Sequence, residues 1–254
     1  MHLSAVKQIA VMALLAIADM ASAQTRVIAH RGYWNKAGAA QNSIQSLQQA
    51  HDIRAYGSEF DVYLSSDGVA VVNHDASIGG LTIENSTYDQ LRGLTLGNGE
   101  KLPTLAQYLQ AASRLKHTRL VLEIKPHQSE AREEEAVQTV LQLVKQYKMQ
   151  SRTDYISFSL HVCKQLVAHD AKARVAYLRG DLNPAQLKEA HFYGLDYHYS
   201  ILDKNPEWMA QAKALGLTVN VWTVNDEQVM RRFITQGADF ITTDQPELLF
   251  SLLQ

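Results

Sequence analysis

Eight short strand-like runs alternate with helical stretches, and this alternation constrains the fold more than any other feature of the sequence. The runs, rich in apolar and β-branched residues, are Val27–His30, Ser58–Tyr63, Arg119–Lys125, Tyr155–Ser159, Arg174–Leu178, Leu195–Ser200, Thr218–Val224 and Asp239–Thr243. The helical patterns that follow most of them are Asn42–His51, Glu130–Lys148, Val162–Ala171, Pro184–His191, Pro206–Leu215, Asp226–Gln236 and Pro246–Leu253. Strands that alternate with helices form parallel βα units. Eight such units in about 230 residues predict an α/β fold, a closed (β/α)8 TIM barrel.

One βα unit is longer than the others. After the second strand, residues 76–102 contain several glycines and a short candidate helix, Thr87–Arg92, before the helical pattern Thr104–Arg114. We therefore expect a small insertion over the barrel mouth. No linker or repeat divides the chain, so residues 24–254 are interpreted as one domain.

The first 23 residues are typical of a secretory signal peptide. Lys7 precedes an apolar run, Ile9–Ala18, and Ala21-Ser22-Ala23 is a small-residue cleavage signature before Gln24. The apolar run is shorter than the roughly 20 residues that cross a bilayer, so no stable membrane anchor is expected. The prediction is export to the periplasm or medium after cleavage near Gln24. A buried N-terminal helix is the alternative.

The composition of the chain limits the kinds of partner that it can bind. The chain of 254 residues has a formal net charge of -2 and no run of Lys or Arg, which argues against a nucleic-acid partner. Cys163 is the single cysteine, so no internal disulfide can form. The oligomeric state is left open.

Two carboxylates mark the second strand. Glu59 and Asp61 are two residues apart, which places both on one face of a strand, where a hard divalent cation would relieve their repulsion. Asp67-Gly68 then predicts a two-residue hairpin loop. Counting back from that loop pairs Asp61 with His74, which would bring an imidazole beside the acids. The alternative is a strand with solvated acids and a surface histidine.

Other strand ends carry ionisable or aromatic residues, and chemistry in such barrels lies at these ends. The first strand ends in His30-Arg31, and the third carries Glu123 and Lys125, again two apart. Later strands end in Tyr197-His198-Tyr199, in Trp222 and in Asp244. Three acids, two cations and two histidines at one barrel mouth indicate a phosphodiester site, since cations neutralise the phosphate and imidazoles act as acid and base. Taken singly, Glu123 and Lys125 could be a simple ion pair and Trp222 a core residue.

An ordered set of motifs covers nearly all of residues 24–254. The motifs are His30-Arg31-Gly32, Gln41-Asn42-Ser43, Glu59-Phe60-Asp61-Val62, Asp67-Gly68 with Val71-Val72-Asn73-His74-Asp75, Leu102-Pro103-Thr104-Leu105, Leu122-Glu123-Ile124-Lys125-Pro126, Trp222-Thr223-Val224-Asn225 and Thr242-Thr243-Asp244. In this order they resemble the glycerophosphodiester phosphodiesterase family, within the phospholipase C-like phosphodiesterase superfamily. The departure is Gln41, where the family usually has Glu in a Glu-Asn-Thr motif.

The resemblance implies a specific site. It implies that Glu59, Asp61 and Glu123 bind Ca2+ or Mg2+. His30 and His74 would be the acid/base pair, with Arg31 and Lys125 on the phosphate. The implied reaction hydrolyses deacylated phospholipids, that is, glycerophosphodiesters, to sn-glycerol 3-phosphate and an alcohol. In the superfamily, a hydroxyl next to the phosphodiester can attack first and give a cyclic phosphate.

The alcohol side of the substrate is not specified by these motifs. We expect Trp222, Tyr197 and Tyr199 to bind substrate, and residues 76–102 to line the leaving-group side. Two other functions stay open, a phospholipase on intact lipid and a non-catalytic phosphate- or polyol-binding barrel. The first would need an amphipathic membrane helix, and no convincing one follows residue 23.

Overall fold

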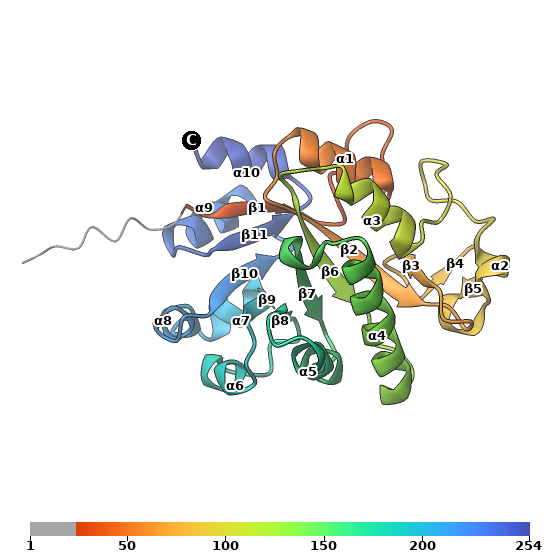
Figure 1. The fold of residues 1–254 in the computed structure, drawn as a ribbon. Helices are drawn as coiled ribbons and strands as arrows, with labels where there is room; N and C mark the ends of the chain where they lie inside the picture. The colour runs from red at the N-terminus through yellow and green to blue at the C-terminus, as the bar shows by residue number, and fades with distance from the viewer. Residues whose placement is uncertain (1–23) are drawn as a thin grey trace, which may run out of the picture.

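The computed structural model describes residues 24–254, and eight parallel strands form its centre. Strand β1 (Arg26–Ala29) pairs with β11 (Phe240–Thr243) on one side and with β2 (Gly57–Leu64) on the other, which closes the barrel. The remaining parallel strands are β6 (Arg119–Ile124), β7 (Thr153–Ser157), β8 (Arg174–Tyr177), β9 (Gly194–His198) and β10 (Thr218–Trp222). The predicted (β/α)8 barrel is therefore confirmed (Figure 1). The predicted signal peptide lies outside the described residues.

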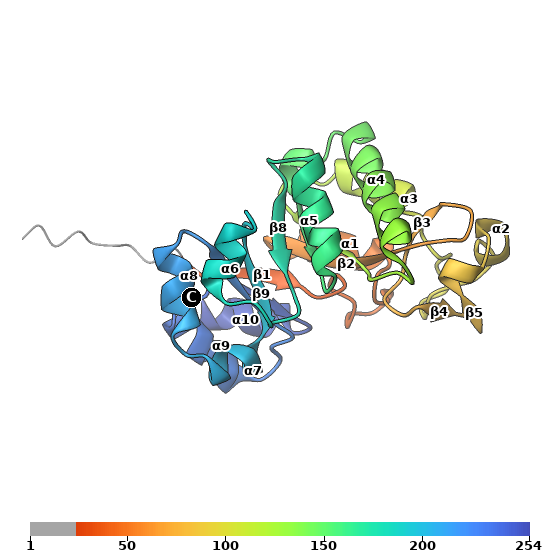
Figure 2. The same cartoon turned by 90° about the horizontal axis from the view of Figure 1, so that it is seen from below.

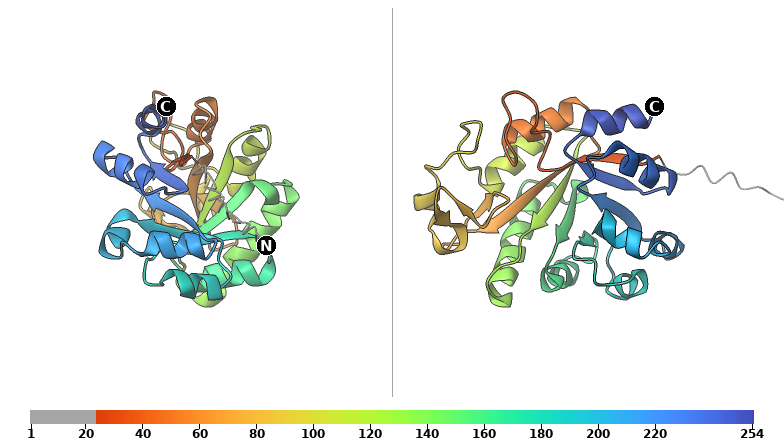
Figure 3. Two further views of the ribbon diagram at one scale, coloured as in Figure 1. Left: turned by 90° about the vertical axis from the view of Figure 1, so that its left-hand side faces the viewer. Right: turned by 180° about the vertical axis from the view of Figure 1, so that it is seen from behind.

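Helices surround the strands, as the end-on view of Figure 3 shows. They are α1 (Ile44–Asp52), α3 (Leu105–Ser113), α4 (Glu130–Gln146), α5 (Leu160–His169), α6 (Pro184–Glu189), α7 (Tyr199–Lys204), α8 (Trp208–Ala214), α9 (Glu227–Thr235) and α10 (Pro246–Leu252). Most begin where the sequence supplies a side-chain oxygen for the free N–H groups of the first turn. Thr104, for example, accepts a hydrogen bond from Gln107 N at 3.2 Å, and Gln107 Oε1 accepts one from Thr104 N. Such capping fixes the residue at which the helix after a strand begins.

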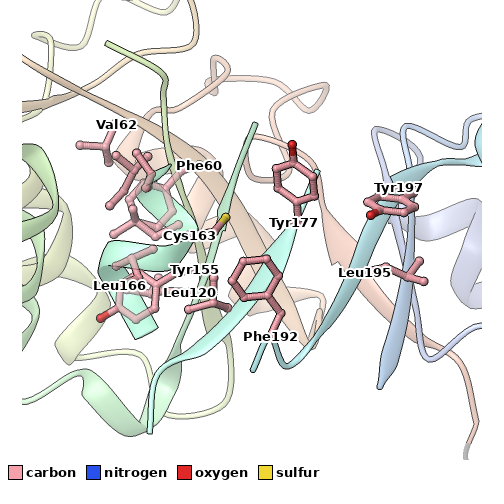
Figure 4. Packing of buried hydrophobic residues seen from close by; sticks show 14 of the residues in the cluster. Phe60, Val62, Leu120, Tyr155, Cys163, Leu166, Tyr177, Phe192, Leu195 and Tyr197 are labelled. Carbon is pink, nitrogen blue, oxygen red and sulfur yellow. The ribbon is translucent and has the colours of Figure 1, made fainter. Parts of the chain in front are cut away.

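The main core lies between the barrel and its helices. On β2, Phe60 and Val62 face outward into this layer and are at most 1% exposed, and the Phe60 ring lies 4.2 Å from that of Tyr108 on α3. Figure 4 shows part of this layer. Because side chains alternate along a strand, the neighbours Glu59 and Asp61 point into the barrel.

The insertion after β2 forms a small lobe beside the barrel (Figures 1 and 2). It contains the hairpin β4 (Ser77–Ile78) and β5 (Leu81–Thr82), the 3-10 turn η1 (Ile83–Asn85) and helix α2 (Tyr88–Leu91). The lobe has its own buried apolar cluster, made of Val71, Ile83, Leu91 and Leu102. Glu100 connects it to α1, since its carboxylate accepts from the backbone N–H groups of Ile44 and Gln45.

The hairpin register differs from the prediction by one residue. Strand β3 (Ala70–Val72) pairs Val62 with Val72, so the partner of Asp61 is Asn73 and not His74. The loop has three residues, 66–68, because Ser65 N donates to Val69 O at 2.9 Å. Gly68 closes it at φ +85°, a conformation open to glycine at little cost.

Two further boundaries differ from the sequence prediction. Tyr199 belongs to helix α7 and not to the preceding strand, because β9 ends at His198. Pro206 lies before helix α8 and not in its first turn, whereas Pro184 and Pro246 open their helices as expected. Within residues 24–254, no helix has the length and apolar character of a membrane span.

Candidate active site

A cavity opens at the carboxyl ends of the barrel strands. One part of its wall is charged and comes from β1, β2, the β3 hairpin and β6; another part is mainly apolar and comes from the strands that follow. The lining residues are His30, Arg31, Glu59, Asp61, His74, Glu123, Lys125, Ile156, Phe158, Leu178, Asp196, Trp222, Thr223 and Thr242. Every predicted acid, cation and catalytic histidine is in this set.

The turn after β1 brings the backbone to the acids. Arg31 and Gly32 both have positive φ, +55° and +77°, and the Arg31 N–H donates to Glu59 Oε2 at 2.8 Å. A Cβ on Gly32 would lie 2.3 Å from Ser46 Oγ on α1. Glycine is therefore required here by both backbone conformation and helix contact.

Three buried carboxylates lie at the bottom of the charged part. Glu59, Asp61 and Glu123 are 3%, 1% and 6% exposed, and one oxygen of each lies within 4.8 Å of the others. β2 and β6 are adjacent parallel strands with Asp61 directly opposite Glu123, which accounts for the convergence. Lys125 Nζ lies 2.8 Å from Asp61 Oδ1 and 2.9 Å from Glu123 Oε1.

Asn42, a buried residue in the loop between β1 and α1, positions Asp61. Its Nδ2 donates to Asp61 Oδ2 at 2.9 Å, while its Oδ1 accepts from the Asp61 N–H at 3.0 Å. Asn42 adopts φ +63°, a conformation that asparagine tolerates better than most residues. The side chain that caps α1 is that of the next residue, Ser43, which accepts from Ser46 N. Asn42 instead fixes the carboxylate.

The three carboxylates carry more negative charge in total than the single ammonium of Lys125 can neutralise. Burial, with the neighbouring Asp61 and Glu123 carboxylates, raises the pKa of Glu59 well above its usual value. Burial and Asp61 raise the pKa of Glu123 to about 8. Burial would also raise the pKa of Asp61, but the Lys125 ammonium and the Asn42 hydrogen bond outweigh it and lower that pKa.

This cluster fits a divalent cation. Hard cations such as Ca2+ and Mg2+ bind carboxylate oxygens. Three carboxylate oxygens, one from each of these residues, converge here. The Lys125 ammonium lies 2.9 Å from Glu123 Oε1 but is shared with Asp61. One ammonium among three buried carboxylates leaves negative charge uncompensated, which is costly away from water. The identity of the ion depends on ligand number and cavity size and belongs to the proposal below.

Each cavity histidine is held by an aspartate. His30 Nδ1 lies 2.8 Å from Asp244 Oδ1, and His74 Nδ1 lies 2.8 Å from Asp75 Oδ1. A carboxylate accepts but does not donate, so each Nδ1 carries the proton and Nε2 is the nitrogen that can exchange one with a ligand. Burial and the Lys125 charge lower the pKa of His74, so its ring is neutral at neutral pH.

Asp244 is itself held in place on both oxygens. Oδ1 also accepts from Trp34 Nε1 at 3.1 Å, and Oδ2 accepts from Asn225 Nδ2 at 2.8 Å. Burial alone would raise the pKa of Asp244, but His30 and these donors outweigh it and lower that pKa. The carboxylate is therefore ionised and can stabilise a protonated His30.

Of the three aromatic residues predicted to bind substrate, one lines the cavity and two lie outside it. Trp222 lines the cavity, and its Nε1 donates to the Asp196 carbonyl at 2.9 Å. Tyr197 points outward from β9 into the main core, where its hydroxyl donates to Leu182 O and its exposure is 0%. The prediction that Tyr197 contacts substrate is therefore wrong. Tyr199 on α7 does not line the cavity, and its ring lies 4.3 Å from that of His198.

Other features of the cavity also differ from the prediction. None of its lining residues comes from 76–102, so the insertion does not form the expected wall. His74 reaches the cavity because it follows the end of β3, not because it pairs with Asp61. Sequence reasoning missed Phe158 and Asp196 as lining residues and gave Asp244 and Asp75 no role. The signal for Asp244 was present, since it directly follows the last strand.

Comparisons with known proteins agree with this geometry. The model of the glycerophosphoryl diester phosphodiesterase family matches residues 30–248. A crystal structure of a glycerophosphodiester phosphodiesterase from Parabacteroides distasonis is 51% identical, with a TM-score of 0.90 over 91% of this chain and 98% of that one. A phosphodiesterase from Oleispira antarctica, solved with the product sn-glycerol-3-phosphate, is 27% identical with a TM-score of 0.79, covering 91% and 97% of the two chains. A curated glycerophosphodiester phosphodiesterase from Caldanaerobacter subterraneus subsp. tengcongensis is 28% identical over 91% of this chain and 98% of its own.

Proposed function

Because the chain belongs to the glycerophosphoryl diester phosphodiesterase family, we propose that it hydrolyses glycerophosphodiesters to sn-glycerol 3-phosphate and an alcohol, with a divalent cation and two histidines. The observation that carries this proposal is the cavity itself, where two aspartate-held histidines line the same wall as three converging buried carboxylates. The product bound to the Oleispira antarctica relative supports the choice of substrate class.

Glu59, Asp61 and Glu123 would hold the cation, which is Ca2+ or Mg2+ in this proposal. When bound, it would polarise the phosphoryl oxygens and offset their charge. Arg31 supports the same phosphate: its NH1 donates to Gln41 Oε1 at 2.6 Å, and its Nε lies 3.8 Å from Asp61 Oδ2. Because Gln41 is neutral, it orients the guanidinium without cancelling its charge. Lys125 adds a second positive charge at the cavity wall.

The two histidines take different parts in the reaction. In the proposed order, the glycerol hydroxyl next to the phosphodiester attacks phosphorus and gives its proton to His74 Nε2. His30 Nε2 protonates the departing alcohol oxygen as the P–O bond breaks, and a cyclic phosphate forms. Water then opens the ring with the two proton transfers reversed. The assignment follows from the neutral ring of His74 and from the ionised Asp244 behind His30.

The pH dependence follows from these roles. His74 must be neutral to accept a proton, and because its pKa is lowered from the usual value of about 6.5, the ring stays neutral at pH 6.5 and becomes protonated only at lower pH. The acidic limb of the kcat/KM profile is therefore expected below that pH. Asp75 raises the pKa of His74 through its hydrogen bond, so Asp75→Asn should move the acidic limb to still lower pH. An unmoved limb would argue against His74 as the base.

Asp244→Asn tests whether Asp244 positions His30, the proposed general acid. The change removes a hydrogen bond to a charged ring, worth about 1.5–3 kcal/mol, so kcat should fall roughly 10- to 10²-fold. The KM and the melting temperature should stay near their wild-type values, because Asp244 holds the His30 ring. An unchanged kcat would contradict this role, and a large fall in melting temperature would show that Asp244 is only structural.

A substrate panel tests the function as a whole. Purified protein is assayed on glycerophosphodiesters, on the corresponding intact phospholipids and on simple phosphomonoesters, with phosphate-containing products identified by mass. The proposal predicts glycerol phosphate from the first group only. Release of diacylglycerol from intact lipid would favour the phospholipase function, and no turnover of any substrate would favour a binding protein.

Export remains a proposal that rests on the sequence. Lys7, the apolar run after it and Ala21-Ser22-Ala23 support cleavage near Gln24. The mass of protein recovered from the medium or periplasm of a secreting host would test it, because an intact Met1 peptide would contradict cleavage.

A further inference from the structure

The insertion lobe lines no part of the cavity, but it contacts the loop and the helix that support the charged part of the cavity wall. These contacts are made by the tight turn 96–100, in which Leu96 N donates to Glu100 O at 2.8 Å and Gly99 has φ +85°. Leu102, two residues farther on, is buried in the apolar cluster of the lobe. The Glu100 carboxylate is therefore presented by a turn that is anchored to the lobe.

Helix α1 has no acidic residue in its own first turn. Its cap, Ser43, accepts from Ser46 N at 2.9 Å, and the N–H groups of Ile44 and Gln45 have no acceptor inside the helix. Glu100 Oε2 accepts from Ile44 N at 3.1 Å, and Glu100 Oε1 accepts from Gln45 N at 3.3 Å. A carboxylate at this end of a helix also interacts favourably with the helix dipole. The lobe therefore supplies the acid that the sequence of α1 lacks.

The first turn of α1 holds the backbone of Arg31. Ser46 Oγ donates to Arg31 O at 3.1 Å, and Ser46 O accepts from Tyr33 N at 2.9 Å. Arg31 has φ +55°, a conformation that a residue other than glycine keeps only where its surroundings hold it. The Arg31 N–H in turn donates to the Glu59 carboxylate at 2.8 Å. A shift of this helical turn would therefore disturb a contact to one of the three buried acids.

The residue two positions before α1 holds a second acid. Asn42 N donates to Arg31 O at 3.0 Å, and the Asn42 side chain both donates to the Asp61 carboxylate and accepts from the Asp61 N–H. The lobe contacts this loop directly as well, because Asn98 Nδ2 donates to Gly38 O at 3.1 Å. The lobe thus holds both the loop between β1 and α1 and the helical turn that follows it.

We propose that the lobe, through Asn98 and Glu100, is a clamp on the start of α1, and that Glu100 is a positioning residue for the cation and phosphate site. This inference rests on the proposed function and gives the insertion a part in it. Glu100 does not line the cavity and takes no part in bond breaking. It fixes the first turn of α1, and the chain around that turn fixes Arg31 and Asp61.

The test compares the loss of two helix caps. The Kd of Ca2+ and of Mg2+ is measured by calorimetry for the wild type, Glu100→Ala and Asn183→Ala. Asn183 is the matched control, because it caps α6 by accepting from Gln186 N at 3.0 Å, and α6 follows β8, which lies across the barrel from β1 (Figure 1). Both variants should melt at a lower temperature than the wild type, so melting alone does not distinguish them.

Only Glu100→Ala is expected to change metal binding. Where the first turn of α1 is formed in only a fraction of the molecules, the apparent Kd rises by the inverse of that fraction. Glu100→Ala should therefore weaken cation binding about 2- to 30-fold, the range that corresponds to the loss of one helix cap. Glu100→Gln keeps one acceptor oxygen and should lie between Glu100→Ala and the wild type. Asn183→Ala should keep the wild-type Kd.

Amide hydrogen exchange separates this inference from the proposed function, because it needs neither metal nor turnover. The N–H groups of Arg31 and Asp61 donate to Glu59 and Asn42, and both should exchange faster in Glu100→Ala but not in Asn183→Ala. A wild-type Kd in Glu100→Ala, or equal changes of Kd in the two variants, would overturn the clamp.

Two further outcomes are also decisive. Should Glu100→Ala fail to fold, Glu100→Gln decides by the same measurements. Should the wild type bind neither cation, the metal part of the proposed function fails, and the exchange of Arg31 and Asp61 alone decides the clamp. Faster exchange in Glu100→Ala, with no hydrolysis of any diester by the wild type, would keep the clamp and refute the proposed function.

Discussion

Replacing either His30 or His74 by alanine is expected to reduce kcat by about 10²–10⁴-fold, the usual contribution of a general acid or base. Both rings line the cavity, and each has its Nδ1 held by an aspartate, so each presents one nitrogen for proton transfer. The two losses should not add in the double variant, because one proton must be taken and another delivered in the same step.

Binding measurements and a matched control make this prediction specific. Neither imidazole is a proposed metal ligand, so Ca2+ or Mg2+ affinity should stay near the wild-type value in both single variants. His169→Ala, at the exposed end of α5, should keep full activity. Near-normal turnover in His30→Ala or His74→Ala would contradict the acid/base assignment.

Loss of the metal is expected to abolish turnover and to lower the melting temperature. Without a cation, three buried carboxylates face one another with Lys125 as the ammonium among them. Binding to the folded state alone stabilises by about 2.7 kcal/mol when the metal is at a hundredfold excess over its Kd. The melting temperature should therefore rise with added Ca2+ or Mg2+ and fall in EDTA.

Glu123→Gln separates the metal site from general effects of chelation. The variant keeps the shape of the side chain but loses one charge, so the metal-dependent rise in melting temperature should shrink and turnover should fall. Glu189→Gln, an exposed change at the end of α6, should respond to metal as the wild type does. Identical metal responses in Glu123→Gln and the wild type would exclude this carboxylate as a ligand.

The barrel and the acid cluster could be predicted because both follow from local patterns. Each strand is a short apolar run followed by a helical pattern, and the parallel order of such units leaves little choice of fold. Glu59 and Asp61, like Glu123 and Lys125, share a face because alternation along a strand has a period of two. Adjacent strands then bring Asp61 opposite Glu123.

The register of the hairpin could not be predicted in the same way. Asp67-Gly68 fits a two-residue loop, but the loop has three residues because the Ser65 side chain donates to Asp67 and accepts from the Val69 N–H. A single hydrogen bond contributes only about 0.5–1.5 kcal/mol net, so turn residues alone do not decide between the two loop lengths. The position of His74 was nevertheless right, since it depends on the strand ending and not on its exact partner.

Residues that act through another residue were also hidden from the sequence. Asn42 supports Asp61 across 19 positions, and Asp244 supports His30 across 214. The place of Asp244 directly after the last strand was visible in the sequence, but the partners of Asn42 and Asp244 were not, because only closure of the barrel brings each pair together. Tyr197, in contrast, could have been placed from local pattern. Its neighbour Asp196 lines the cavity, and alternation along the strand sends Tyr197 outward to the helices.

The most direct test of metal-dependent diester hydrolysis follows the phosphorus of a glycerophosphodiester by 31P NMR in the presence of the purified protein. We expect the diester signal to convert to that of glycerol 3-phosphate, the conversion to stop in EDTA, and the conversion to resume when Ca2+ or Mg2+ is restored in excess. Undiminished conversion after exhaustive chelation, or a diester signal that persists with metal present, would contradict it.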